Sequence, residues 1–329
     1  MSMLNERLRK VSGIVWASVA IIIAFSLFAP GFLSGKNIEL ILKNSAILVV
    51  IGVGMTMAII SQQIDLSIGG TMTLAGLISA YYITSVEQVG YVHIGVALVI
   101  GILSGILVGV FNGLFIGIFR FNYWLVTFAT MSITFGLAQG LSNGSIVSNY
   151  AKIFRSTLVS GTAVLGVSNL VWISLLIAIV MMVFMGKTRF GYHIYAIGDS
   201  EHSALTAGID VKRVRMGIYM ISGMLAGVGG VLMIAKTNSA SAALGNGYEF
   251  DAIAACIVGG TSFEGGKGGL GGTVFGALIL AAFKSGIQLI GLSNYWQKVA
   301  VGLFILAIIV ADVLSSQKKR KEALRRIYK

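Results

Sequence analysis

A glycine-rich segment with one lysine is the part of this sequence most similar to a nucleotide-binding motif. Residues 259–268 read GGTSFEGGKG. A phosphate-binding loop of the G-x-x-x-x-G-K-[ST] type needs Ser or Thr after its lysine, because that hydroxyl binds Mg²⁺. Here Gly268 follows Lys267, and the segment joins two apolar stretches instead of a strand and a helix. The sequence therefore predicts that this chain binds no ATP itself.

The other residues that could do chemistry are scattered. His93, His193 and His202 lie far apart in the sequence, and Cys256 is the single cysteine. One cysteine permits no intrachain disulfide and no cysteine-based metal cluster. The sequence offers no carboxylate pair and no nucleophile with a neighbouring base. It predicts a protein that is not an enzyme and that holds neither a metal nor a cofactor.

A polar heptapeptide, residues 61–67 (SQQIDLS), interrupts two apolar stretches. Two interpretations are open. Asp65 could cap the next helix in a tight turn, or the turn could line a pathway or gate. A separate group of amides within apolar stretches is expected to form hydrogen bonds between helices: Asn44, Asn112, Asn122 and Asn143.

The composition is that of a membrane protein. Of 329 residues, 56% are hydrophobic and 11% charged, whereas soluble proteins carry about 25% charged residues. A membrane-spanning helix needs about 20 mostly apolar residues. Nine clear candidates and one short one, residues 250–260, are present. The clear candidates are residues 11–29, 39–60, 66–85, 92–119, 124–142, 165–186, 214–235, 269–292 and 295–314.

The basic residues give the orientation. With ten crossings and the N-terminus inside, the inside holds most of the 24 basic residues, as the positive-inside rule requires. These include a cluster in residues 318–329, which predicts a cytoplasmic tail over residues 315–329. If residues 250–260 do not cross the membrane, the C-terminal tail lies outside and the excess of basic residues on the inside is lost. We therefore expect that segment either to cross or to pair with another partial segment.

The 12 acidic residues disfavour a carrier driven by an ion gradient. They lie in the terminal segments, in loops or near predicted helix ends. Proton- and sodium-coupled carriers usually keep a carboxylate near the middle of the membrane. Backbone carbonyls also bind sodium, so an ion-coupled secondary carrier stays an alternative.

Glycines recur every four residues in the segment 92–119, at Gly101, Gly105, Gly109, Gly113 and Gly117. This spacing keeps them on one helix face, where a neighbouring backbone can approach closely. The pattern predicts helix packing.

The longest inside loop, residues 187–215, contains a stretch compatible with a short helix, residues 199–207. Asp199 or Ser200 could cap it, and Gly208 could end it. A short helix between basic flanks at the cytoplasmic face suits docking of a partner, although a mere connector is the alternative.

Several motifs, in this order, resemble those of the permeases of ribose-type sugar ABC importers. They extend over roughly residues 30 to 313 and are DLSIG (65–69), TFATMSI (127–133), TRFG (188–191), YAIG (195–198), GYEFDAIAA (247–255), VGGTS (258–262) and YWQ (295–297). Two features depart from the family pattern. No proline precedes Thr127, and Leu205 stands at a usual arginine position.

The resemblance implies an all-α, polytopic protein of about ten transmembrane helices, with a type II ABC importer-like permease fold and a single domain over residues 1–329. It implies a bacterial inner-membrane protein with both termini cytoplasmic. Cytoplasmic ATPase subunits would bind ATP and Mg²⁺, a periplasmic sugar-binding protein would deliver the substrate, and a second permease copy or paralogue would complete the complex. The substrate would be a monosaccharide, a ribose-like pentose or a hexose; a nucleoside or a furanose signalling molecule is the alternative.

Three sets of residues are expected to carry this function. The resemblance assigns coupling to the ATPase to Ser200, Glu201, His202, Ser203, Ala204, Leu205, Thr206, Ala207 and Gly208. Polar side chains predicted to line the route or its gates are Gln62, Asp65, Ser67, Asn122, Thr127 and Thr261. Charged residues placed outside, and predicted to contact the binding protein, are Lys36, Lys152, Arg155, Lys236 and Glu249.

Overall fold

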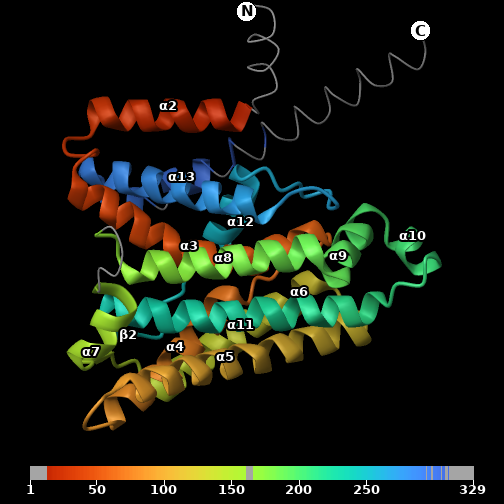
Figure 1. The fold of residues 1–329 in the computed structure, drawn as a ribbon, viewed down its shortest axis with the longest axis horizontal. Coiled ribbons are helices and arrows are strands. Elements are labelled where there is room, and N and C mark those ends of the chain that lie inside the picture. The colour runs from red at the N-terminus through yellow and green to blue at the C-terminus, as the bar shows by residue number, and fades with distance from the viewer. Residues whose placement is uncertain are drawn as a thin grey trace, which may run out of the picture. The chain divides into compact units, whose positions relative to one another are not determined.

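The computed structural model describes residues 13–160, 166–293, 295–297, 299–304, 306–307 and 310, and these residues are mostly helical (Figure 1). The first helices are α2 (Gly13–Phe28), α3 (Gly35–Ile60), α4 (Ile68–Ser85), α5 (Tyr91–Gly113), the π-helix η1 (Leu114–Ile118) and α6 (Tyr123–Ser142). The next are α7 (Lys152–Arg155), the π-helix η2 (Ser156–Ser160), α8 (Asn169–Lys187), α9 (Arg189–Asp199) and α10 (Glu201–Thr206). The last are α11 (Val211–Thr237), α12 (Tyr248–Val258) and α13 (Leu270–Leu289). Two short strands, β1 (Val147–Ser148) and β2 (Ser239–Ala240), pair antiparallel.

Six helical segments in the described part of the chain are long and apolar enough to cross a membrane: Gly35–Ile60, Tyr91–Ile118, Tyr123–Ser142, Asn169–Lys187, Val211–Thr237 and Leu270–Leu289. The predicted short segment 250–260 is confirmed as α12, which has 11 residues. Segment 295–314 lies partly outside the described residues, and the total of ten crossings stays a prediction.

Helix α4 is central although its hydroxyl side chains, such as Thr71 and Thr73, lower its hydropathy. It packs against α5, α6 and α11, and most of its residues are buried. Thr73 donates to the carbonyl of Gly69 and accepts from the amide of Gly245. Neighbouring helices thus shield α4, so it does not need an apolar surface all round.

The predicted glycine face of α5 packs closely against α11, as expected. A Cβ atom added at Gly105 would overlap the carbonyl oxygen of Gly223, and one added at Gly223 would overlap that of Gly105. One turn away, a Cβ atom added at Gly227 would overlap the carbonyl of Gly101, and one added at Gly101 would overlap the Val231 side chain and crowd the carbonyl of Gly227. The two backbones touch directly, and Figure 1 shows α5 and α11 lying side by side along their lengths.

The described residues divide into two compact units, one from residues 13–41 with those from 279 onward and one from the residues between 42 and 278. In the first, Ala29, Phe32 and Ala282 form a small buried cluster against which Phe25 packs. Asn37 is also buried there, and its side-chain amide donates to the carbonyl of Phe32 over 2.7 Å. All interactions that concern the candidate site lie in the second unit.

Candidate coupling segment and buried polar network

The segment between α8 and α11 folds into two short helices that are each capped by their own sequence. The Thr188 hydroxyl accepts from the amide of Gly191 at the start of α9, and the Ser200 hydroxyl accepts from the amide of Ser203 at the start of α10, both at 3.2 Å. Gly208, with φ +82°, follows the end of α10, in the left-handed region that glycine tolerates. The predicted helix with a Ser200 cap and a Gly208 end is confirmed.

Helix α10 presents most of its surface to the outside. Of its six residues, all of which the structure describes, Ala204 is the buried one. His202 and Leu205 are exposed, Leu205 by 46%. In Figure 1, α10 lies beyond the ends of α8 and α11. An exposed apolar side chain on a projecting, well-capped helix is a suitable contact for another protein.

Glu201 does not point freely outward, because it pairs with the first turns of α11. Arg215 donates from Nη1 to Oε1 of Glu201 over 3.1 Å and from Nη2 to Oε2 over 2.6 Å. The arginine side chain is 19% exposed and the glutamate side chain 46%. This bidentate geometry fixes orientation as well as distance. Glu201 therefore attaches α10 to α11.

The turn at residues 61–67 contacts the end of α9 through Gln62. The side-chain amide of Gln62 donates to the carbonyl oxygen of Gly198 over 2.9 Å and to that of Glu264 over 2.8 Å. Two carbonyl acceptors identify the contacting atom as the amide nitrogen. Gly198 itself packs directly on the carbonyl of Ile60. Gln62 thus joins three segments that are distant in the sequence.

The glycine-rich loop at residues 259–268 completes this contact. Gly265 and Gly266 have φ of +80° and +66°, and a Cβ atom on Gly265 would overlap the side chain of Gln62. The amide of Gly266 donates to the carbonyl of Ile60 over 2.9 Å. The Tyr195 hydroxyl of α9 donates to the carbonyl of Gly268 over 3.0 Å, and burial raises the pKa of this phenol, which keeps it a donor. These glycines therefore allow the loop to turn tightly and to pack against both the turn at residues 61–67 and α9.

The inner part of the same turn begins a buried hydrogen-bond network. Asp65 is 1% exposed. Its Oδ1 accepts from the backbone amide of Ser67 over 3.0 Å and from the Ser67 hydroxyl over 2.6 Å, and its Oδ2 accepts from the Ser222 hydroxyl of α11 over 2.6 Å. These three donors stabilise the buried carboxyl group and offset part of the cost of its burial.

The network continues through Ser67 into two further helices. The side-chain amide of Asn112 in α5 donates to the Ser67 hydroxyl over 2.8 Å, and its Oδ1 accepts from the Thr130 hydroxyl of α6 over 2.7 Å. All three side chains are at most 3% exposed. The turn, α5, α6 and α11 are therefore connected by one chain of buried hydrogen bonds.

These contacts bear on the two interpretations of Asp65. The residue before α4 is Ser67, which makes no side-chain cap bond to that helix. Asp65 accepts from the backbone amide of Ser67, two residues on, as a capping side chain does, and also from the Ser222 hydroxyl of α11. These bonds agree with the capping interpretation, and the pathway interpretation stays a prediction. Of the amides expected to bond between helices, Asn112 does so, and Asn44 accepts from Lys236 of α11. Two others lie at the ends of α6, Asn122 as its N-cap and Asn143 as its C-cap.

The six residues predicted to line a route are not brought together as one set. Asp65 and Ser67 share the buried network, while Gln62 is exposed at the other side of the turn. Thr127 is buried and donates to the carbonyl of Tyr123 in its own helix. The buried Thr261 hydroxyl has no hydrogen-bond partner among the residues that the structure describes. The prediction that these side chains line the route stays untested.

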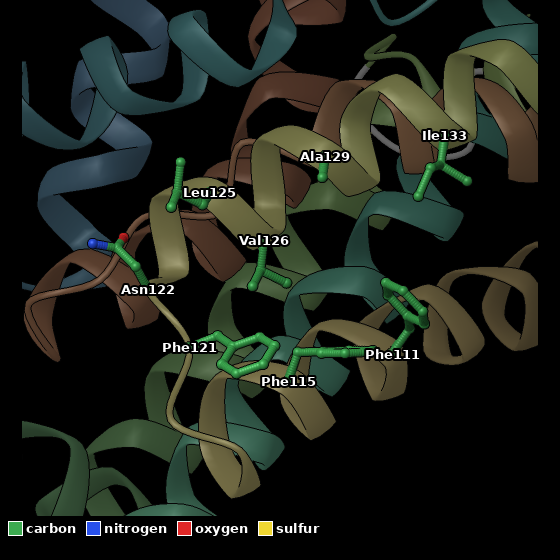
Figure 2. A pocket seen from close by; sticks show the side chains of 8 residues that line it. All are labelled: Phe111, Phe115, Phe121, Asn122, Leu125, Val126, Ala129 and Ile133. Atoms are coloured by element: carbon green, nitrogen blue, oxygen red, sulfur yellow. The ribbon is translucent and has the colours of Figure 1, made fainter.

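An open groove of about 430 Å³ lies between α5 with η1 and α6, and Asn122 is at one end of it. Figure 2 shows the phenylalanine side chains facing those of α6 across this space. The lining residues are Phe111, Phe115, Phe121, Asn122, Leu125, Val126, Ala129 and Ile133. The size is typical of ligand pockets, but a single polar side chain offers little to a solute with many hydroxyl groups.

Two of the five residues predicted to contact a binding protein are not free surface charges. Glu249 is 2% exposed, because its carboxylate packs against Gly69 at the first turn of α4. Lys236 is half-buried and donates to Asn44. Burial of Glu249 contradicts its proposed docking role. Lys36, Lys152 and Arg155 are exposed and stay candidates.

A family model described as "Branched-chain amino acid transport system / permease component" matches residues 37–309. This chain belongs to that permease family. The permease is 32% identical over 299 residues to the ribose import permease protein RbsC of Escherichia coli (strain K12), covering 90% of this chain and 91% of that protein.

Other relatives carry the names of different sugars. The permease is 34% identical over 304 residues to the galactose/methyl galactoside import permease protein MglC of Haemophilus influenzae, covering 88% of this chain and 90% of that protein. It is 33% identical over 301 residues to the D-allose transport system permease protein AlsC of Escherichia coli (strain K12), covering 91% and 90%. No solved structure matches this chain. The family and the apolar helices identify an all-α membrane protein of the ribose-type ABC importer permeases.

Two members of the network, Thr130 and Ser222, were missed by the sequence analysis. Thr130 lies inside the TFATMSI motif, and Ser222 directly precedes Gly223 of the α5–α11 contact. A polar residue beside a close-packed glycine is a usable signal, because close backbone approach brings a short side chain within reach of the next helix.

Proposed function

We propose that this permease is the membrane-spanning subunit of an ATP-driven importer that moves a monosaccharide across the bacterial inner membrane. The observation that supports this most directly is the similarity, over about nine-tenths of each chain, to permeases named for ribose, galactose and allose. These three sugars share a small ring with several hydroxyl groups.

In this proposal, a separate protein chain hydrolyses ATP. ATP and Mg²⁺ would bind to cytoplasmic ATPase subunits that contact α10, and the permease would not act as an enzyme. The described residues contain no group of three or more His, Cys, Asp or Glu that could hold a metal. A periplasmic sugar-binding protein would deliver the substrate on the opposite side, and a second permease copy or paralogue would complete the complex. Both termini would be cytoplasmic.

The test is uptake in sealed proteoliposomes that contain the permease and its ATPase subunit, with labelled ribose, galactose and allose and a binding protein. The expected result is accumulation of one sugar that depends on both ATP and the ATPase. Accumulation without the ATPase, driven by an imposed ion gradient, would overturn the proposal in favour of a secondary carrier. Transport of a nucleoside, and of none of the three sugars, would support an ATP-driven importer but show that its substrate is not a monosaccharide.

Leu205 provides a focused test of the docking role of α10. Replacing this exposed side chain by Glu should weaken binding of the ATPase to the permease by about tenfold, because an apolar anchor at the centre of a contact is worth ~1–2 kcal/mol or more. Leu205→Met, which keeps the apolar contact, is the matched control and should bind as the wild type does. Unchanged binding of Leu205→Glu would show that the ATPase does not use this face.

A further inference from the structure

The turn at residues 61–67 is bonded on its two sides to different parts of the permease. Gln62 bonds to the end of α9, two residues before the Ser200 cap of α10. Asp65 and Ser67, only a few residues later, bond to α11 and α5. Besides the Glu201–Arg215 pair, which joins α10 directly to α11, the turn thus gives a second hydrogen-bonded connection, from the end of α9 beside α10 to the buried network.

Gln62 is held in a conformation that glutamine does not favour. Its φ is +61°, in the left-handed region that is unfavourable for a residue with a long side chain. Such a conformation persists only where surrounding contacts enforce it. Here both amide hydrogens of the side chain are used, on the carbonyls of Gly198 and Glu264, so the unusual backbone places two donors between two acceptors.

The contact with α9 is direct backbone packing as well as hydrogen bonding. A Cβ atom on Gly198 would overlap the carbonyl of Ile60 and crowd the amide of Gly266, and that amide donates to the same carbonyl of Ile60. No flexible side chain separates the end of α9 from the end of α3. Displacement of α9 must therefore move the turn or break these bonds.

On the inner side, the partners of the turn are fully buried. Asp65, Ser67, Asn112 and Ser222 are each at most 1% exposed, so water does not replace a broken bond cheaply. A change at the turn is consequently passed to the helices that hold these side chains, or it leaves a buried polar group without a partner. Buried networks of this kind favour discrete alternative arrangements over gradual deformation.

We propose that the turn at residues 61–67 transmits movement of α10 to α5, α6 and α11, with Gln62 as the positioning residue that engages α9. This inference rests on the proposed function, because it assumes that an ATPase moves α10. In this arrangement Gln62 sets how much of each ATP hydrolysis cycle becomes sugar transport, and it does not bind the sugar.

Gln62→Gly is the informative variant, because glycine accepts φ +61° freely and removes the side chain that carries the two donors and packs on Gly265. In proteoliposomes the number of sugars transported per ATP hydrolysed should fall by roughly fivefold or more, the usual range of coupling between sites. ATPase binding and the melting temperature should stay as in the wild type. Asn143→Gly is the matched control, since Asn143 also has a left-handed φ, +47°, at an exposed helix end; its transport ratio should not change.

An unchanged transport ratio in Gln62→Gly would overturn the inference. Gln62→Glu is a second variant of nearly the same size, in which carboxylate oxygens face two carbonyl oxygens; it should also lower the ratio. Failure of the wild type to accumulate sugar with ATP would instead contradict the proposed function, so the two failures are distinguishable.

A double-mutant cycle tests whether the two sides of the turn act together. Thr130→Val removes the hydroxyl that bonds Asn112 at the far end of the network. If the turn transmits movement, Gln62→Gly and Thr130→Val together should lower the transport ratio little more than one of them alone. Independent effects, which multiply in the double variant, would contradict transmission through the turn.

Discussion

Helix α11 meets its neighbours through two contrasting contacts. Along α5 the contact consists of glycines whose backbones touch, and a side chain at Gly105 or Gly223 has no room. At the turn the contact is a carboxylate, Asp65, that accepts a hydrogen bond from Ser222. At the first contact backbone touches backbone, so no change of rotamer at Gly105 or Gly223 can alter it, whereas the second consists of hydroxyl, carboxylate and amide groups that could exchange partners. We therefore expect α5 and α11 to move as one body and the turn to be where rearrangement occurs.

The largest loss of stability is expected from a substitution at the glycine contact between α5 and α11. Gly105→Ala should destabilise the fold by about 1–3 kcal/mol or more, because the added methyl group overlaps the Gly223 carbonyl and the helices must separate. The measurement is the melting temperature of the purified permease in detergent. Gly136→Ala is the matched control, because a Cβ atom there meets nothing within 4 Å. It should be neutral or stabilising by up to ~1 kcal/mol through helix propensity. Equal melting temperatures for the two variants would contradict rigid α5–α11 packing.

The buried carboxylate is expected to have the next largest effect. Asp65→Ala removes the acceptor for three donors, from Ser67 and Ser222, and should cost about 2–3 kcal/mol in stability because buried donors stay unpaired. Ser222→Ala removes one of those donors and leaves the other two bonds in place, so it should cost about 1 kcal/mol. Thermal unfolding of both variants gives the comparison. A loss in Asp65→Ala no greater than that in Ser222→Ala would argue that the network does not stabilise the turn.

The sequence predicted packing features better than polar contacts. The four-residue spacing from Gly101 to Gly117 was sufficient to predict a close helix contact, because helix geometry alone places these residues on one face. The α10 helix was likewise predictable from Ser200 and Gly208, since capping is local. Thr188 and Gly191, recognised only as a motif, are explained by the same local chemistry: Thr188 caps α9, and Gly191 packs on the carbonyl of Met185.

The partners of polar residues depend on the register between helices, which a single sequence does not specify. Glu249 follows a loop and reads as a surface charge, yet its carboxylate lies against Gly69, which is 180 positions away. The neighbouring Gly223 indicates that Ser222 lies at a helix contact, but nothing near it in the sequence identifies Asp65 as its partner. The helix α4 differs from these cases, because its run of apolar residues predicted it as segment 66–85, and only the polar partners of its hydroxyl groups needed the structure.

The smallest expected effect concerns the attachment of α10 to α11. Glu201→Gln removes the charge that pairs with Arg215, and its cost in stability should be at most ~1 kcal/mol because Glu201 is 46% exposed. Asp210→Asn is the matched control, since the Asp210–Arg213 pair is more exposed, by 51% and 88%, and should contribute less. The sharper readout is amide hydrogen exchange in α10, which should increase in Glu201→Gln and stay unchanged in Asp210→Asn. Increased exchange in α10 together with fewer sugars transported per ATP would show that the partner needs α10 in a fixed orientation. Equal exchange in both variants would mean that the caps, and not the ion pair, hold α10 in place.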